Sequence, residues 1–151
     1  MSTPAQPVLQ ITIADYRAVV QPLDRWQLSI RWHFDNLADQ PLYLLLAQPL
    51  VTPITEPLVL DHSAHEPLVP LSTNAPPEFS IVTIGSHDSL EHRMKYPLAL
   101  PTATPSLRIA GRFGYSLVAP DPAWQQGQNW QQIERWQQIA ESQPLDVAPQ
   151  P

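Results

Sequence analysis

Two histidines three residues apart, His62 and His65, are the first residues in this sequence whose types and spacing could do chemistry. Two imidazoles at that separation can share a metal ion if the backbone is helical or turns sharply and a third ligand comes from elsewhere in the fold. The available donors are His87, Asp88, Glu91 and His92. However, the pair lies in the proline-bounded segment DHSAHEP, without the helical register of zinc motifs. We therefore predict no metal site and no cofactor, and we keep His62 and His65 as the candidates should a metal bind.

No catalytic motif stands out elsewhere. Ser86 follows Gly85 in IGSHD, but the G-x-S-x-G elbow is absent, and so are a phosphate loop and a paired-carboxylate motif. The chain has no cysteine, which excludes disulfides, thiolate nucleophiles and iron–sulfur clusters. We predict that the protein is not an enzyme. A metal-dependent enzyme centred on His62 and His65 is the less favoured alternative.

Two glycines interrupt an otherwise packed strand pattern in AGRFGY, at positions 111 and 114. A missing side chain there could admit a small ligand or a sugar beside Phe113 and Tyr115. In a strand, however, glycine more often marks a bulge or a corner. A small-ligand or carbohydrate-binding module is therefore the first alternative function.

The most distinctive stretch is DPAWQQGQNWQQIERWQQIAESQP, near the C-terminus. Asp121 followed by Pro122 predicts a helix start, because aspartate caps the first N–H groups and proline lacks the N–H that would be unpaired. We expect a short helical turn, a break near Gly127, and a main helix from about Trp130 to Glu141. Pro144 stops it.

The predicted main helix is amphipathic. On a helical wheel Ile133 and Ala140 lie centrally, Trp130 and Trp136 flank them, and Trp124 falls off the stripe. An isolated helix of a dozen residues is marginal in water, so it needs something to lie against. We expect that cover to be either the protein's own sandwich or a partner. The predicted partner-binding residues are Trp124, Trp130, Ile133 and Trp136.

The elements before this segment read as strands. In WQLSIRWHF, residues 26–34, apolar and polar residues alternate, which predicts one buried and one exposed face. Further strand candidates are VLQITIADYRAVV, FSIVTI, LEHRMKYPL and LRIAGRFGYSLV. From residue 40 a weak repeat opens four times on Gln-Pro-Leu or Glu-Pro-Leu, and we interpret it as short strands that begin at prolines rather than as a solenoid.

These patterns predict an all-β fold: an antiparallel β-sandwich of seven or eight short strands with one C-terminal α-helix. A small β-barrel is the alternative. The segments LSIRWHFDN, TIGSHDSLEHR and GYSLV give residues 8–119 a general resemblance to immunoglobulin-like sandwiches of bacterial accessory domains. The expected organisation is an N-terminal tail over 1–7, the sandwich over 8–119, a helical segment over 120–142 and a flexible tail over 143–151.

Composition narrows the partners. The net charge is −6, and the eight basic residues are scattered, with Lys95 the only lysine. Nucleic acids and anionic membranes need clustered positive charge, so we expect neither as a partner. The N-terminus lacks a basic and then apolar leader pattern, and no apolar run is long enough to span a bilayer, so we expect a cytoplasmic location. The predicted function is a non-catalytic protein-interaction or accessory domain, with a protein partner or a second copy possible.

Overall fold

The computed structural model describes residues 8–47, 50–51, 57–64, 79–100, 104–127 and 130–149. It is 62% strand and 8% helix, and its sheets are open, with no closed barrel among the described residues. The all-β prediction is confirmed, and the alternative of a closed barrel is wrong. No helix within these ranges is long and apolar enough to cross a bilayer.

A three-stranded antiparallel sheet, here sheet A, has the order β1-β2-β7. It consists of β1 (Leu9–Gln21), β2 (Arg25–Asn36) and β7 (Ser89–Ala99). The alternation predicted for residues 26–34 is confirmed, because the five apolar side chains of β2 are at most 1% exposed. In β1 the alternation is interrupted by a bulge between Ile13 and Asp15, which keeps apolar residues on the buried face on both sides of it.

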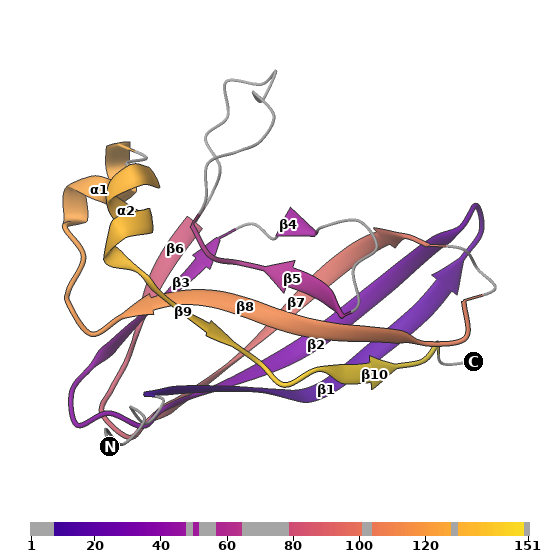
Figure 1. Ribbon diagram of the computed structural model, residues 1–151, viewed down its shortest axis with the longest axis horizontal. Helices are drawn as coiled ribbons and strands as arrows, with labels where there is room; N and C mark the ends of the chain where they lie inside the picture. Colours follow the sequence, from indigo (N-terminus) through magenta and orange to yellow (C-terminus); the bar gives the residue numbers. More distant parts are fainter. Residues whose placement is uncertain are drawn as a thin grey trace, which may run out of the picture.

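The second sheet, sheet B, is built around β8 (Leu107–Ser116). One edge of β8 pairs with β3 (Leu42–Ala47) and with β5 (Leu58–Asp61), the latter in parallel. Outside these two lie β6 (Phe79–Ile84) beside β3 and β4 (Leu50–Val51) beside β5. The opposite edge of β8 is antiparallel to β9 (Gln138–Glu141) and to β10 (Leu145–Val147) (Figure 1).

The proline repeat marks strand starts, as expected. Strands β3, β4 and β5 each begin at the leucine that directly follows the proline, at Leu42, Leu50 and Leu58. Proline has no N–H to give to a ladder, so it is tolerated just before a strand. The fourth unit, residues 66–73, lies outside the described residues.

The main core fills the space between the two sheets. Its centre is aromatic: the ring of Phe113 in sheet B meets Trp32 at 5.2 Å and Phe34 at 4.9 Å, edge to face in both cases. Gly111 makes this packing possible, because a Cβ atom there would lie 2.4 Å from Cη2 of Trp32. This glycine therefore admits a side chain of the protein itself, not a ligand.

The helical segment begins as predicted and ends earlier. The Asp121 carboxylate accepts a hydrogen bond from the backbone N–H of Ala123 at 2.9 Å, which confirms the cap. The first helix, α1 (Pro122–Gly127), stops at the predicted break, and α2 covers Trp130–Trp136.

The prediction of one helix to Glu141 is wrong, because Gln138–Glu141 form β9. Residues Arg112–Tyr115 of β8 would otherwise leave their backbone groups on this edge unpaired, and pairing with β9 satisfies them. This tertiary gain outweighs the helix propensity of the segment, which is worth only tenths of a kcal/mol per residue.

The predicted flexible tail also needs correction. Leu145–Val147 form β10 against Leu107–Ile109, and the side chain of Val147 is fully buried in the main core. Sheet B therefore extends well past residue 119, and the C-terminal stretch is part of the domain.

Candidate functional site

The tryptophan-rich segment packs on its own domain through a second hydrophobic cluster. The side chain of Ile133 is fully buried against Leu45, Ala47 and Ala64, which we call the α2 seat. Leu45 and Ala47 belong to β3, and Ala64 follows β5, so the seat lies on the outer side of sheet B. Figure 1 shows α1 and α2 at this end of the molecule, beside β3 and β6.

A side-chain amide fixes the end of α2 to the seat. Oε1 of Gln137 accepts a hydrogen bond from the backbone N–H of Ala64, and its Nε2 donates to the Ala64 carbonyl, both at 2.8 Å. The Gln137 amide thus pairs with both the N–H and the carbonyl of Ala64, as the backbone of a neighbouring strand would. Gly114 leaves room for it, because a Cβ atom on Gly114 would lie 2.2 Å from Oε1 of Gln137.

The structure brings together three of the four predicted partner-binding residues. Trp124 and Trp136 are part-buried against the cluster around Ile133. The indole N–H of Trp136 donates to the backbone carbonyl of Val118 at 2.6 Å. Trp130 begins α2, but its side chain lies outside the described part of the protein.

A buried polar network lies next to the α2 seat. His62 is 1% exposed, and both of its ring nitrogens have partners: Nδ1 is 2.8 Å from the Ala47 carbonyl, and Nε2 is 2.6 Å from the Tyr96 hydroxyl. The Tyr96 oxygen also accepts a hydrogen bond from the indole N–H of Trp32 at 2.8 Å. The network therefore joins sheet A, through Trp32 and Tyr96, to the ends of β3 and β5.

The partners fix the protonation of this network. A carbonyl only accepts, so Nδ1 of His62 carries a hydrogen, and the neutral ring must accept at Nε2 from the Tyr96 hydroxyl. Burial lowers the pKa of His62 and raises the pKa of Tyr96, so both stay neutral near pH 7. The His62 ring stacks on Phe113 with centroids 4.9 Å apart.

These contacts decide the metal candidates. Both ring nitrogens of His62 form hydrogen bonds within the fold, so neither is free to bind a metal. His65 lies outside the described residues. Within the described ranges no three His, Asp or Glu side chains form a group that could hold an ion. His92, one of the other candidate donors, pairs with Trp32 on the inward parity of β7, but its side chain is exposed.

Sequence reasoning missed the role of His62. Trp32 and Tyr96 both carry a polar group on an otherwise apolar ring, and such groups need a partner when buried. That requirement was visible in the sequence. The identity of the partner was not, because His62 and Tyr96 are 34 residues apart and meet only in the folded chain.

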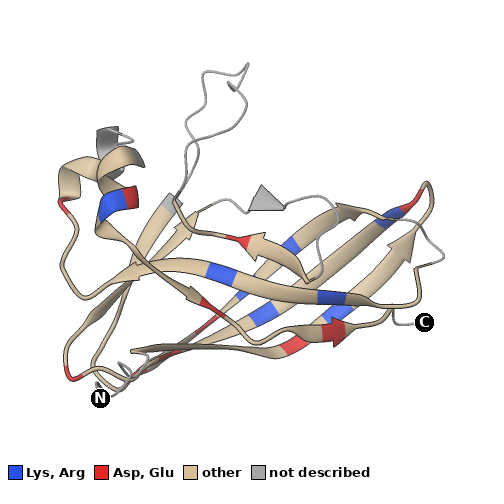
Figure 2. Cartoon of the chain, viewed as in Figure 1, with Lys and Arg blue, Asp and Glu red and all other residues tan. Residues whose placement is uncertain are grey.

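The outer face of sheet A, which is opposite to the main core, carries a network of charged residues. Arg31 forms an ion pair with Asp15 at 2.8 Å and lies 3.7 Å from Glu91. His33 faces two carboxylates, with Nδ1 at 3.2 Å from Glu91 and Nε2 at 3.0 Å from Asp35. Partial burial lowers the pKa of His33, but the hydrogen bonds and charges of Glu91 and Asp35 outweigh it, so this pKa is raised overall. Figure 2 shows charged residues of both signs on these strands.

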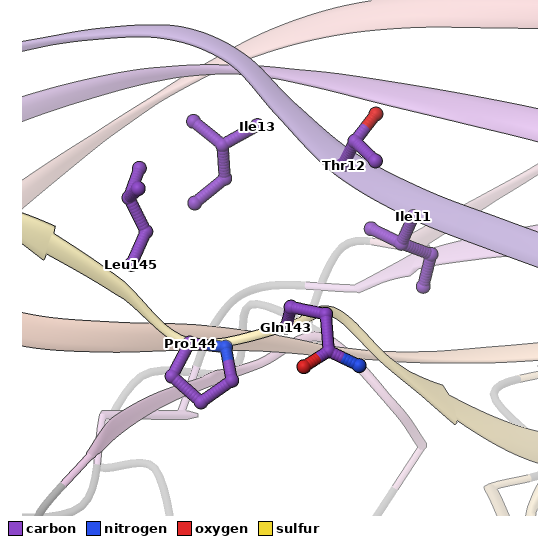
Figure 3. A pocket seen from close by; sticks show the side chains of 6 residues that line it. All are labelled: Ile11, Thr12, Ile13, Gln143, Pro144 and Leu145. Carbon is purple, nitrogen blue, oxygen red and sulfur yellow. The ribbon is translucent and has the colours of Figure 1, made fainter.

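A shallow apolar hollow of about 200 Å³ lies where the edges of the two sheets meet. Figure 3 shows Ile11 and Ile13 of β1 on one side, with Pro144 and Leu145 on the other. Pockets for small molecules are usually about 300–1,000 Å³, so this hollow is large enough for one apolar group rather than a whole ligand.

Comparisons with known proteins add little to this geometry. No protein-family model matches the sequence, and no curated protein matches it. Three chains of solved structures match. One of them is the X-ray structure of a target of the Northeast Structural Genomics Consortium: it is 12% identical, the match covers 96% of this chain and 89% of that one, and the TM-score is 0.48. A likeness of this size supports no conclusion about function.

Proposed function

We propose that this protein is a non-catalytic protein-interaction domain whose contact surface surrounds α1 and α2. The observation that carries the proposal is the apolar surface left beside the docked helix. Val118, whose carbonyl accepts the indole N–H of the part-buried Trp136, is 67% exposed, and Ile139, three residues after Trp136 in the chain, is 39% exposed. Scattered exposed apolar residues are normal, but grouped ones around a tryptophan anchor are typical of protein interfaces.

Sheet register places Ile139 on the same face of sheet B as the α2 seat. Ile139 in β9 pairs with Gly114 of β8, which in turn pairs with Leu45 of β3. Residues in one register row share a face of the sheet, so Ile139 lies on the same outer face as the α2 seat. The side chain of Gln137 lies over Gly114 in the middle of this row, so Ile139 is an exposed apolar residue beyond that amide, at the edge of sheet B.

The small-ligand and carbohydrate alternative ranks second. The spaces above Gly111 and Gly114 are taken by Trp32 and Gln137, so the glycines open no ligand site. The hollow beside Ile11 is the remaining observation in its favour. A metal-dependent enzyme at His62 is disfavoured because the imidazole is already bonded on both sides.

We also propose the immunoglobulin-like sandwich as the finer description of the fold. Two sheets that face each other across one aromatic core support it. The parallel pairing of β5 with β8 is the feature that such an assignment must accommodate. A cytoplasmic location stays a prediction of the sequence.

Site-specific photo-crosslinking tests the proposed surface. A photoreactive amino acid is placed at Ile139, and in a matched control at Thr12, an exposed residue on the outer face of sheet A. Irradiation in extract of the cells that make the protein should give discrete adducts from position 139 only. Trp136→Ala should reduce them, because the tryptophan anchors the contact. An adduct of twice the chain mass would identify a second copy as the partner, and equal patterns from both positions would refute the surface.

A further inference from the structure

The basic residues are scattered along the sequence, but the fold brings five of the eight onto one face. These five lie on the outer face of sheet A: Arg17 of β1, Arg25 and Arg31 of β2, and Arg93 and Lys95 of β7. Three carboxylates of the same strands point the same way: Asp15, Asp35 and Glu91. This face is therefore positive on balance, in a chain whose net charge is −6.

Register separates the two signs of charge along the strands. The carboxylates lie in the half of the face that is farther from the turn between β1 and β2, and they are shared among several cations. Asp15 pairs with Arg31 at 2.8 Å and with Arg93 at 3.3 Å. Glu91 lies beside His33 and Arg31. The charges in this half therefore largely neutralise each other.

The half nearer the turn is basic and has no such compensation. Arg17 of β1, Ser29 of β2 and Lys95 of β7 form one register row, and Arg25 lies four residues nearer the turn. Within the described residues, the side chains of these three cations form no ion pair. The hydroxyl of Ser29 accepts a hydrogen bond from Arg93 at 3.2 Å, so its own hydrogen can be donated to a ligand.

The turn itself has an unusual residue. Leu23 is 87% exposed, and its φ of 65° lies in the left-handed region. The Cβ atom makes this conformation unfavourable, and glycine or asparagine is the usual residue in such turns. Leu23 belongs to neither hydrophobic cluster, so packing does not offset the strain. Strained residues of this kind occur most often where a protein contacts another molecule.

Leu23 and the three cations form one continuous surface, which we call the turn-end surface. Gln21 pairs with Arg25 at the base of the turn, so Arg25 lies directly beside it. From Arg25 to Ser29 is four residues of β2, about 14 Å at 3.4 Å per residue, so an extended chain of about six residues spans the surface. Figure 1 shows this turn at the end of the molecule away from α1 and α2.

We propose that the turn-end surface binds an extended acidic segment of another protein, with an apolar residue of that segment against Leu23. Its carboxylates pair with Arg17, Arg25 and Lys95, and an arginine can hold a carboxylate through two parallel hydrogen bonds. Asp24, next to Leu23 in the turn, repels carboxylates there, so the segment has its apolar residue at that point. The carboxylates in the other half of the face repel the segment too, which limits it to the turn end.

The chemistry of this surface favours a protein segment over other anionic partners. Sites for single-stranded nucleic acids stack bases on aromatic rings. The outward positions of β1, β2 and β7, all within the described residues, hold no tryptophan, tyrosine or phenylalanine. Anionic membranes are usually bound by clusters of four to eight Lys or Arg residues, and this surface has three.

An NMR titration of the isotope-labelled full chain tests the proposal with two synthetic peptides, LEEEEEL and SEEEEES. Their two ends are identical, so either chain direction can place an end residue against Leu23. We expect amide shift changes around the turn and around the row of Ser29. LEEEEEL should bind about fivefold more tightly than SEEEEES, because one apolar contact is worth about 1 kcal/mol. Both affinities should fall as salt is added.

Four single variants locate the binding. Arg17→Gln and Lys95→Gln should each weaken both peptides by about threefold, the size expected for an exposed ion pair. Arg108→Gln, the same exchange at an exposed arginine of β8, is the matched control and should change neither affinity. Leu23→Asn should remove the preference for LEEEEEL. It should also raise the melting temperature by about 2 °C, because asparagine tolerates the left-handed conformation.

Several results would overturn the proposal. A lower melting temperature in Leu23→Asn would show that Leu23 serves the fold, and equal affinities for the two peptides would show that it makes no contact. A short oligothymidylate or phosphatidylserine vesicles that bound as tightly as LEEEEEL, with the same losses in the variants, would assign the surface to nucleic acid or lipid. The crosslinking test at Ile139 concerns the other end of the molecule, so its outcome is independent of this one.

Discussion

The main core and the α2 seat are both apolar, but they are held together in different ways. Among the described residues, nineteen buried ones from both sheets form the main core, whereas the seat has three beneath Ile133. Strand alternation orients most side chains of the core, and the hydrogen bond between Trp32 and Tyr96 lies within it. The seat depends on side-chain hydrogen bonds, from His62 to Ala47 and from Gln137 to Ala64. We expect a small cluster of the second kind to open at a lower free energy than the main core.

The largest expected effect breaks the main core. In Gly111→Ala the new methyl group would lie 2.4 Å from Cη2 of Trp32 and 3.0 Å from Cε2 of Phe113. Both rings are fully buried and cannot turn aside, so we expect a loss of about 3 kcal/mol in the free energy of unfolding. Urea denaturation followed by circular dichroism measures it.

Gly85→Ala is the matched control for this change. A Cβ atom on Gly85 would meet its nearest neighbour, Asp88, at 3.8 Å, an ordinary contact, and its φ is not positive. We expect a change within about 0.5 kcal/mol. If the two alanine variants were equally stable, the close approach of Trp32 to β8 would be wrong.

A smaller effect is expected at the α2 seat. Ile133→Ala truncates a fully buried side chain of α2. We expect a loss of about 2 kcal/mol, at the low end for such truncations because a small surface cluster can collapse onto the gap. Ile139→Ala, at a part-exposed position on the same face, should cost about 0.5 kcal/mol. Thermal melting of the two variants ranks them. The reverse order would mean that α2 does not lie on the seat in solution.

The same contrast explains what the sequence could predict. The main core was visible in it, because alternation in residues 26–34 orients Trp26, Trp32 and Phe34 without any knowledge of their partners. The helix start was visible too, since Asp121 caps a residue two positions away. Both are local signals.

The seat was not visible, because its contacts are between distant residues. Gln137 and Ala64 are 73 residues apart, and Trp32 and Tyr96 are 64 apart. The predicted end of α2 was wrong for a related reason. The local composition of residues 138–141 favours a helix, but these residues pair with the edge of β8 as a strand. Such competition between local preference and long-range pairing is decided only in the folded chain.

A smaller effect is the pH dependence of the free energy of unfolding that His62 and His33 contribute. It has opposite signs for His62, in the buried network, and His33, on the outer face of sheet A. For His62, buried and neutral, the pKa is lowered in the folded state, so its stabilisation is complete above the unfolded pKa of about 6.5 and is lost as the pH falls. For His33, paired with carboxylates, the pKa is raised, so its stabilisation is present at low pH and is lost as the pH rises through the folded value.

The difference between native protein and His62→Gln isolates the first contribution. Between pH 7.5 and 5.5 the native protein should lose more free energy of unfolding than the variant, because burial disfavours the charged ring in the folded chain. Denaturant titrations at the two pH values measure this. Parallel curves would show that His62 takes up its proton as easily in the folded chain as in the unfolded one.

The smallest effect is expected on the exposed face of sheet A. Glu91→Gln removes one of the two carboxylates beside His33, so the pKa of His33 should fall toward its ordinary value, as followed by an NMR titration of the ring protons. The free energy of unfolding should change by less than about 0.5 kcal/mol, because these ion pairs are solvent-exposed. Asp39→Asn, which acts on His87 instead, should leave the His33 titration unchanged. A pKa that stayed raised after Glu91→Gln would assign the effect to Asp35, and a large loss of stability would mean that the charged face supports the fold as strongly as the seat does.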